Sequence, residues 1–179
     1  MVFFVAAAHF VLAPFLGFLW SLTRIFIPAP SGRQRFNVLG ALNAISHELI
    51  TVTNDTYINA ESLCLLLNKL AALNLTVPIT LFLDNARYQK CALLQTLAAS
   101  LNIELCYLPP YSPNLNLMER LWKFVKKQCL YSKYYDDFTA FKSAIQGCLL
   151  DLPTTHKAAL DSLLTLRFQR FDKTQFVTA

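Results

Sequence analysis

The stretch ITLFLDN, residues 79–85, sets the fold class of this chain. Five apolar residues follow Pro78, and a short apolar run of this length is typical of a strand buried on both faces of a sheet. The run ends abruptly at Asp84 and Asn85, so Asp84 marks the carboxyl end of the strand. Ligands of α/β sheets bind at the carboxyl ends of strands, which makes Asp84 a candidate site residue.

Strand and helix patterns alternate on both sides of this strand. Apolar residues at positions 63, 66, 67 and 70 form one stripe of a helix that starts near Asn59. Other helical stripes predict helices at 94–101, 116–131, 138–149 and 160–168, and β-rich runs predict strands at 2–5, 36–42, 49–53 and 103–108. This order predicts a mixed α/β sheet, βββαβαβα, followed by helices. We expect a single domain over 1–179, with a core at about 2–150 and a helical extension at 151–179.

Length, composition and charge exclude several classes of protein. The chain has 179 residues, is 55% hydrophobic and only 15% charged, and is therefore too apolar for intrinsic disorder. Its net charge of +5 permits a polyanionic partner. The five cysteines form no C-x-x-C pair and are odd in number, which predicts reduced thiols, a cytoplasmic location and no zinc site.

The amino-terminal stretch raises the alternative of a small membrane-anchored protein. Residues 2–22 carry no charge, which is the length of a spanning helix. A signal peptide would need basic residues before its apolar part, and a spanning helix would have to include His9, Pro14 and Gly17. We therefore expect a buried strand here and no stable membrane insertion.

Two acidic residues are the candidates for chemistry. Asp84 ends a strand and Glu119 begins a helix, and such ends can meet at one edge of a sheet to bind a divalent cation such as Mg²⁺. Structural alternatives exist for both. Asn116 and Glu119 have the spacing of a capping box, and Asp84 with Asn85 could belong to a turn.

Three blocks of sequence resemble the DDE transposases, in the bacterial insertion-sequence branch of the Tc/mariner superfamily. They are LDNARYQK at 83–90, LPPYSPNLN at 108–116 and MERLWK at 118–123. The 34 residues between Asp84 and Glu119 resemble the spacing of the second and third acids of that superfamily. The resemblance implies a ribonuclease-H-like fold and an Asp, Asp, Glu triad that binds two Mg²⁺ or Mn²⁺ ions for DNA cleavage and strand transfer in transposition and integration.

The sequence departs from this family at the first acid. Where relatives read FVDAAHF, residues 4–10 read FVAAAHF, so Ala6 stands at the position of the first Asp. A methyl group cannot coordinate a cation, and catalysis is therefore expected to be impaired or lost. Relatives also carry helix-turn-helix modules upstream of the first strand, whereas this sequence begins at the strand.

By this resemblance Asp84 and Glu119 are metal ligands, and the partners are transposon-end and target DNA, with a homodimer as the common assembly. Basic residues near the two acids are candidates for phosphate contacts: Arg87, Lys90, Arg120, Lys123, Lys126 and Lys127. The alternative is a non-catalytic module of the same fold that binds DNA or another transposase subunit.

Overall fold

The computed structural model describes residues 1–12, 21–24, 26, 34–110 and 112–168. Five strands form one mixed sheet in the order β3-β2-β1-β4-β5. Strands β1, β2 and β3 are antiparallel neighbours, whereas β4 is parallel to β1 and β5 is parallel to β4. Their bounds are β1 Val2–Val11, β2 Arg35–Asn43, β3 Leu49–Asn54, β4 Ile79–Leu83 and β5 Ile103–Tyr107.

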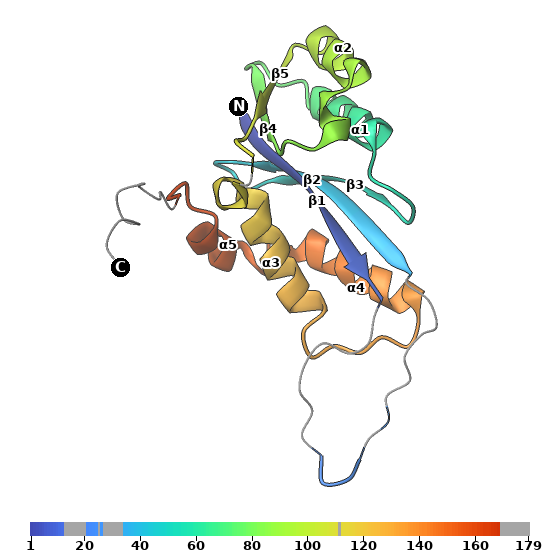
Figure 1. Cartoon of the computed structure of the whole chain (residues 1–179). Helices are drawn as coiled ribbons and strands as arrows, with labels where there is room; N and C mark the ends of the chain where they lie inside the picture. Colours follow the sequence, from blue (N-terminus) through green and yellow to red (C-terminus); the bar gives the residue numbers. More distant parts are fainter. Residues whose placement is uncertain (13–20, 25, 27–33, 111, 169–179) are drawn as a thin grey trace, which may run out of the picture.

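Helices cover both faces of the sheet (Figure 1). One face carries α1 (Ala60–Ala71) and α2 (Ala92–Ser100), and the other carries α3 (Leu117–Cys129), α4 (Phe138–Asp151) and α5 (Lys157–Leu163). Two short 3₁₀ turns, η1 (Arg87–Lys90) and η2 (Pro113–Leu115), follow β4 and β5. The carboxyl end of β4 thus leads through η1 to α2, and that of β5 leads through η2 to the start of α3.

The central strand β1 is buried on both faces. Its even-numbered residues from 4 to 10 pack in the core beneath α3 and α4, while Phe3 and Val5 pack beneath α1. Side chains of a strand alternate between the two faces, and both faces are covered here. This explains why the first ten residues read as an almost continuous apolar run.

The element order expected from the sequence, βββαβαβα followed by helices, is confirmed. The first strand is longer than the predicted 2–5, because β2 pairs with β1 from Phe3 to Val11 and continues its ladder. The last helix was expected at 160–168 but covers Lys157–Leu163. Its buried residue Leu160 and the following residue Leu164 join the core formed by α3 and α4.

The apolar amino-terminal stretch does not form a long helix where the structure describes it. Residues 2–11 of that stretch are strand β1, and residues 13–20 lie outside the described part. Across the described ranges, no helix has the length and apolar character needed to cross a membrane.

A glycine in β2 sets how closely α3 approaches the sheet. A Cβ atom at Gly40 would lie 2.7 Å from Met118 Cε and 3.0 Å from Trp122 Cζ2, both on α3. Gly40 is also the register partner of Ala6. The missing side chain therefore allows the first turns of α3 to pack directly over positions 6 and 40.

We expect Gly40→Val to lower the free energy of unfolding by about 1–3 kcal/mol, because the added side chain overpacks the contact with α3. Urea unfolding followed by circular dichroism measures this change. The matched control is Gly147→Val in α4, where a Cβ meets nothing within 4 Å and the change should stay within about 0.5 kcal/mol. Equal losses in both variants would contradict the packing role of Gly40.

Candidate functional site

Positions 6 and 84 continue the register of the neighbouring parallel strands β1 and β4. Val5 of β1 pairs in register with Leu83 of β4, so the next residues along each strand are Ala6 and Asp84. Ala6 lies on the face covered by α3 and is only 1% exposed, while Asp84 is half-buried. A carboxylate at position 6 would therefore lie beside that of Asp84.

Asn116 joins the start of α3 to both strands. Its Nδ2 donates to Asp84 Oδ1 at 3.0 Å and to the Val5 carbonyl oxygen at 3.2 Å. Its Oδ1 accepts from the backbone N–H of Met118 at 3.0 Å and so caps the helix. The Asn116 side chain is fully buried. This single residue brings the first turn of α3, which carries Glu119, to the carboxyl end of β4.

The two structural alternatives for the acids are wrong. Asn116 does cap α3, but the Glu119 carboxylate completes no capping box, because the Asn116 backbone N–H donates to the Pro113 carbonyl of η2 instead. Asp84 and Asn85 do not form a local turn by their side chains, which bond to residues 32 and 23 positions further along the chain. Neither acid is therefore explained by local capping or turn chemistry.

The electrostatics of Glu119 reflect this proximity. Partial loss of water around its carboxyl group raises the pKa of Glu119, and the nearby Asp84 carboxylate raises it further. Lys126, two turns along α3, partly offsets both effects. The residue as a whole stays exposed, so its carboxylate remains accessible to a ligand.

A small hollow of about 140 Å³ lies beside Asp84 and Asn85. Asn85 Nδ2 donates to the Leu108 carbonyl oxygen at 2.7 Å. Its Oδ1 is buried, and no donor in the described part of the chain reaches it. An unpaired buried acceptor is typical of a place that a water or ligand completes. The hollow is lined by Asp84, Asn85, Pro109, Pro110, Ser112 and Pro113.

The residues present do not fit a two-ion site. Ala6 offers a methyl group at the shared position, and one oxygen of Asp84 already accepts from Asn116. Within the described ranges, no group of three His, Cys, Asp or Glu side chains could hold a metal ion. Mg²⁺ held by one or two carboxylates relies on waters and substrate phosphates for its other ligands, so Asp84 and Glu119 suffice for one ion at most.

The basic residues predicted to contact DNA lie on two elements beside the acids. Arg87 and Lys90 are exposed on η1, and Lys90 Nζ lies 5.3 Å from the centre of the Tyr107 ring. Lys123 and Lys127 are exposed on the outer side of α3, with Lys126 half-buried between them. Their contact with DNA remains a prediction.

Arg120 differs from the other basic residues because its guanidinium binds the chain itself. It donates to the carbonyl oxygens of Thr165 at 2.8 Å, Arg167 at 3.0 Å and Leu163 at 3.4 Å. Its Cζ also lies 5.4 Å from the centre of the Phe168 ring. Arg120 therefore fastens the segment after α5 to α3, and its predicted contact with DNA has no support in this geometry.

No local pattern predicts the second role of Asn116, which is to bond to β1 and to Asp84. The pattern before an apolar helix indicates a cap, but it cannot show that the same amide reaches two strands more than 30 positions away. A turn was likewise one alternative for Asn85, whereas its amide bonds to the Leu108 carbonyl oxygen. Such long-range bonds become visible only once the strand order is known.

The sequence model of a family described as DDE superfamily endonuclease matches residues 23–142, about two thirds of the chain. The match includes Asp84 and Glu119 but begins after β1, so it does not extend to Ala6. No curated protein matches the chain.

Solved structures of transposases and integrases share the fold. A pre-cleavage Mos1 transpososome has a TM-score of 0.58 at 12% identity, over 96% of this chain and 57% of that chain. A simian T-cell lymphotropic virus intasome also has 0.58, at 18% identity, over 84% and 47%. The HTLV-2 integrase catalytic core with magnesium has 0.55 at 14% identity, over 84% of both chains. The ribonuclease-H-like fold is thereby confirmed, and this chain spans about half the length of the first two.

Proposed function

Because the chain belongs to the DDE superfamily of endonucleases, we propose that it is the catalytic domain of an insertion-sequence transposase whose metal site is disabled at Ala6. The observation that carries this proposal is the convergence of positions 6, 84 and 119, with a methyl group at the first and carboxylates at the other two. The fold and the remaining acids are those of a DNA-cleaving domain, but one ligand is missing.

The missing ligand has a direct chemical consequence. In two-ion sites one ion lowers the pKa of an attacking water or hydroxyl group, and the other stabilises the leaving oxygen. Asp84 and Glu119 would hold a single Mg²⁺ or Mn²⁺ ion weakly. Because the second ion has no sufficient ligand set, we expect no DNA cleavage by this chain as it stands.

DNA binding does not require the metal and is retained in this proposal. Lys123 and Lys127 are exposed on α3, the helix that carries Glu119, and Arg87 and Lys90 are exposed on η1, which follows Asp84. Ala6 itself favours the second candidate function, a non-catalytic module that binds DNA or another transposase subunit, for example in a homodimer. In either case DNA affinity should fall steeply as salt increases.

Titration of Mn²⁺ by calorimetry tests the proposal. We expect weak binding to the unsubstituted chain and at least ten-fold tighter binding to Ala6→Asp, because a third carboxylate completes the ligand set. The tighter binding should vanish in the double variant Ala6→Asp with Glu119→Gln, whose side chain keeps the size of Glu119 but loses its charge. Cleavage of plasmid DNA by Ala6→Asp in Mn²⁺ is the matching activity assay.

The pH dependence of this titration provides a control. Protons compete with the metal for Glu119, and the pKa of Glu119 is raised above its ordinary value. Affinity should therefore begin to fall at a higher pH than an ordinary glutamate would give. Equal and weak Mn²⁺ binding by all three proteins would mean that the acids do not share a site, and the proposal would fail.

A further inference from the structure

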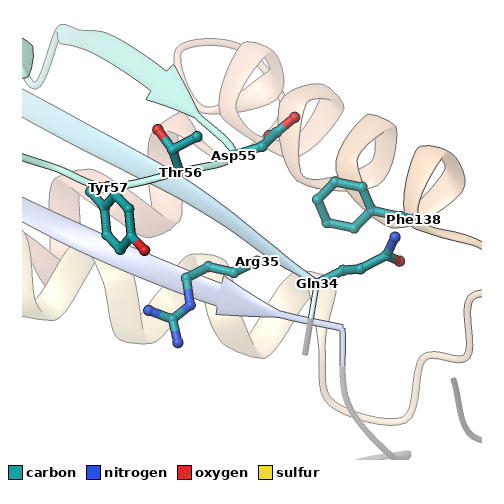
Figure 2. Close-up of a pocket in the computed structure, with 6 residues that line it drawn as sticks. All are labelled: Gln34, Arg35, Asp55, Thr56, Tyr57 and Phe138. Atoms are coloured by element: carbon teal, nitrogen blue, oxygen red, sulfur yellow. The ribbon is translucent and has the colours of Figure 1, made fainter. Parts of the chain in front are cut away.

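A second and larger hollow lies where β2 begins and β3 ends, away from the two acids. Its volume is about 660 Å³ and it is open to solvent. Arg35, the first residue of β2, pairs with Val11 at the far end of β1, five residues beyond Ala6. Figure 2 shows the side chains around this hollow. They are Gln34, Arg35, Asp55, Thr56, Tyr57 and Phe138.

The loop that forms one wall is held in place by buried amides. Asn37 is fully buried, and its Nδ2 donates to Asn54 Oδ1 at 2.9 Å and to the Thr56 carbonyl oxygen at 3.0 Å. Asn54 Nδ2 in turn donates to the Tyr57 carbonyl oxygen at 2.7 Å. A loop fixed on a rigid sheet in this way presents its side chains in a defined geometry without a ligand.

The fixed loop presents an aromatic ring to solvent. Tyr57 is 77% exposed, and no aromatic ring in the described ranges is stacked on its ring. Phe138, which is half-buried at the start of α4, closes the opposite side of the hollow (Figure 2). An exposed aromatic ring beside a basic side chain, as Tyr57 lies beside Arg35, is the arrangement on which proteins that bind single-stranded nucleic acid stack a base.

The charges around the hollow favour an anion. The Asp55 carboxylate is paired with Lys142 Nζ at 2.6 Å, so its negative charge is compensated. No ion pair or hydrogen bond in the described part of the chain engages the Arg35 guanidinium. Arg35 and Tyr57 extend on the same side of the hollow (Figure 2). A planar ring and an uncompensated guanidinium thus lie together.

We propose that this hollow binds an unpaired nucleotide of a DNA single strand, with the base stacked on Tyr57 and its phosphate bonded by Arg35. Stacking is tolerant of base identity because every base offers a flat face. The site needs no metal and shares no residue with Asp84 or Glu119. Its ligand is an unpaired strand, whereas the basic residues of α3 are suited to the phosphates of any DNA.

Fluorescence anisotropy with a labelled single-stranded oligothymidylate, in EDTA and at low salt, tests this site. We expect Tyr57→Ala to weaken binding roughly 5- to 100-fold, as the loss of one stacked base does, and Tyr57→Phe to retain it. Arg35→Ala should weaken binding and reduce its salt dependence. The matched control is Tyr131→Ala, which removes a tyrosine that is 60% exposed elsewhere and should leave affinity unchanged.

Three results of the binding assay would contradict the proposal, and two of them would indicate a different ligand. Equal losses of single-strand affinity in Tyr57→Ala and Tyr131→Ala would overturn the site. It would also be overturned if a duplex of the same length bound as tightly as the single strand and lost affinity equally in Tyr57→Ala. Competition by thymidine monophosphate at concentrations equal to the oligonucleotide would show a free-nucleotide site and overturn the single-strand assignment. Because the assay contains EDTA, its result is independent of whether Ala6→Asp restores metal binding.

Discussion

The Ala6→Asp variant is expected to unfold at a lower temperature than the unsubstituted chain in EDTA and to recover most of that loss in Mn²⁺. Position 6 is only 1% exposed and lies level with the Asp84 carboxylate. A carboxylate there loses most of its water and adds a third negative charge beside Asp84 and Glu119. We expect the free energy of unfolding to fall by about 2–4 kcal/mol without metal.

Metal binding should reverse this loss because the ion binds the folded state alone. A free ion concentration one hundred times the dissociation constant stabilises a folded protein by about 2.7 kcal/mol. Thermal unfolding in EDTA and in increasing Mn²⁺, followed by circular dichroism, measures both parts. The unsubstituted chain, with only two carboxylates, should show a small change over the same concentrations.

A matched control separates a metal site from a general effect of buried charge. Ala8 lies on the same strand and the same face as Ala6 and is 2% exposed, but it lies two residues farther from the level of Asp84. Ala8→Asp should be destabilised by a similar amount and should not recover in Mn²⁺. If the ion rescued both variants equally, or neither, the three positions would not form one site.

Local patterns in the sequence determine most of this fold. The stripe at 63, 66, 67 and 70 and the run at 79–83 are signals within one element, and α1 and β4 lie where they predict. The full length of β1 is not a local signal, because residues 6–11 become strand by pairing with β2, more than 20 positions away. The segment after α5 likewise depends on Arg120, which binds its carbonyl oxygens from another helix.

In the candidate site, too, the residues can be predicted from local signals, but their contacts with distant elements cannot. Asp84 and Glu119 could be identified from a strand end, a helix start and a family resemblance, and the geometry brings them together. The sequence showed that position 6 lacks an acid, but only the parallel register of β1 and β4 shows that it lies beside Asp84. The role of Asn116 required three elements to be placed at once.

The second large effect is expected for Asn116→Leu, which should lower the free energy of unfolding by about 3–5 kcal/mol. The change removes a helix cap worth about 1 kcal/mol. It also leaves the Val5 carbonyl oxygen and Asp84 Oδ1 without their donor in a buried place, and each unpaired group costs about 1–3 kcal/mol. Urea unfolding of the unsubstituted chain and the variant gives the difference.

Two further substitutions separate the role of Asn116 as a cap of α3 from its hydrogen bonds to Val5 and Asp84. Asn116→Ser keeps a hydroxyl oxygen that can cap α3 but is too short to donate to both Val5 and Asp84, so it should lose less stability than Asn116→Leu. Asn116→Asp also keeps a cap oxygen but replaces the donor with a carboxylate facing Asp84. Two carboxylates in contact raise the pKa of one of them in the folded state.

The Asn116→Asp variant therefore has a specific dependence on pH. A carboxyl group whose pKa is higher in the folded than in the unfolded state favours folding while it is protonated, and that contribution is lost as pH rises through the folded pKa. The variant should approach the stability of Asn116→Ser at pH 4 and fall below it at pH 7. A difference between the two that does not change with pH would show that Asn116 serves α3 only as a cap, and the convergence of Asp84 and Glu119 would need another cause.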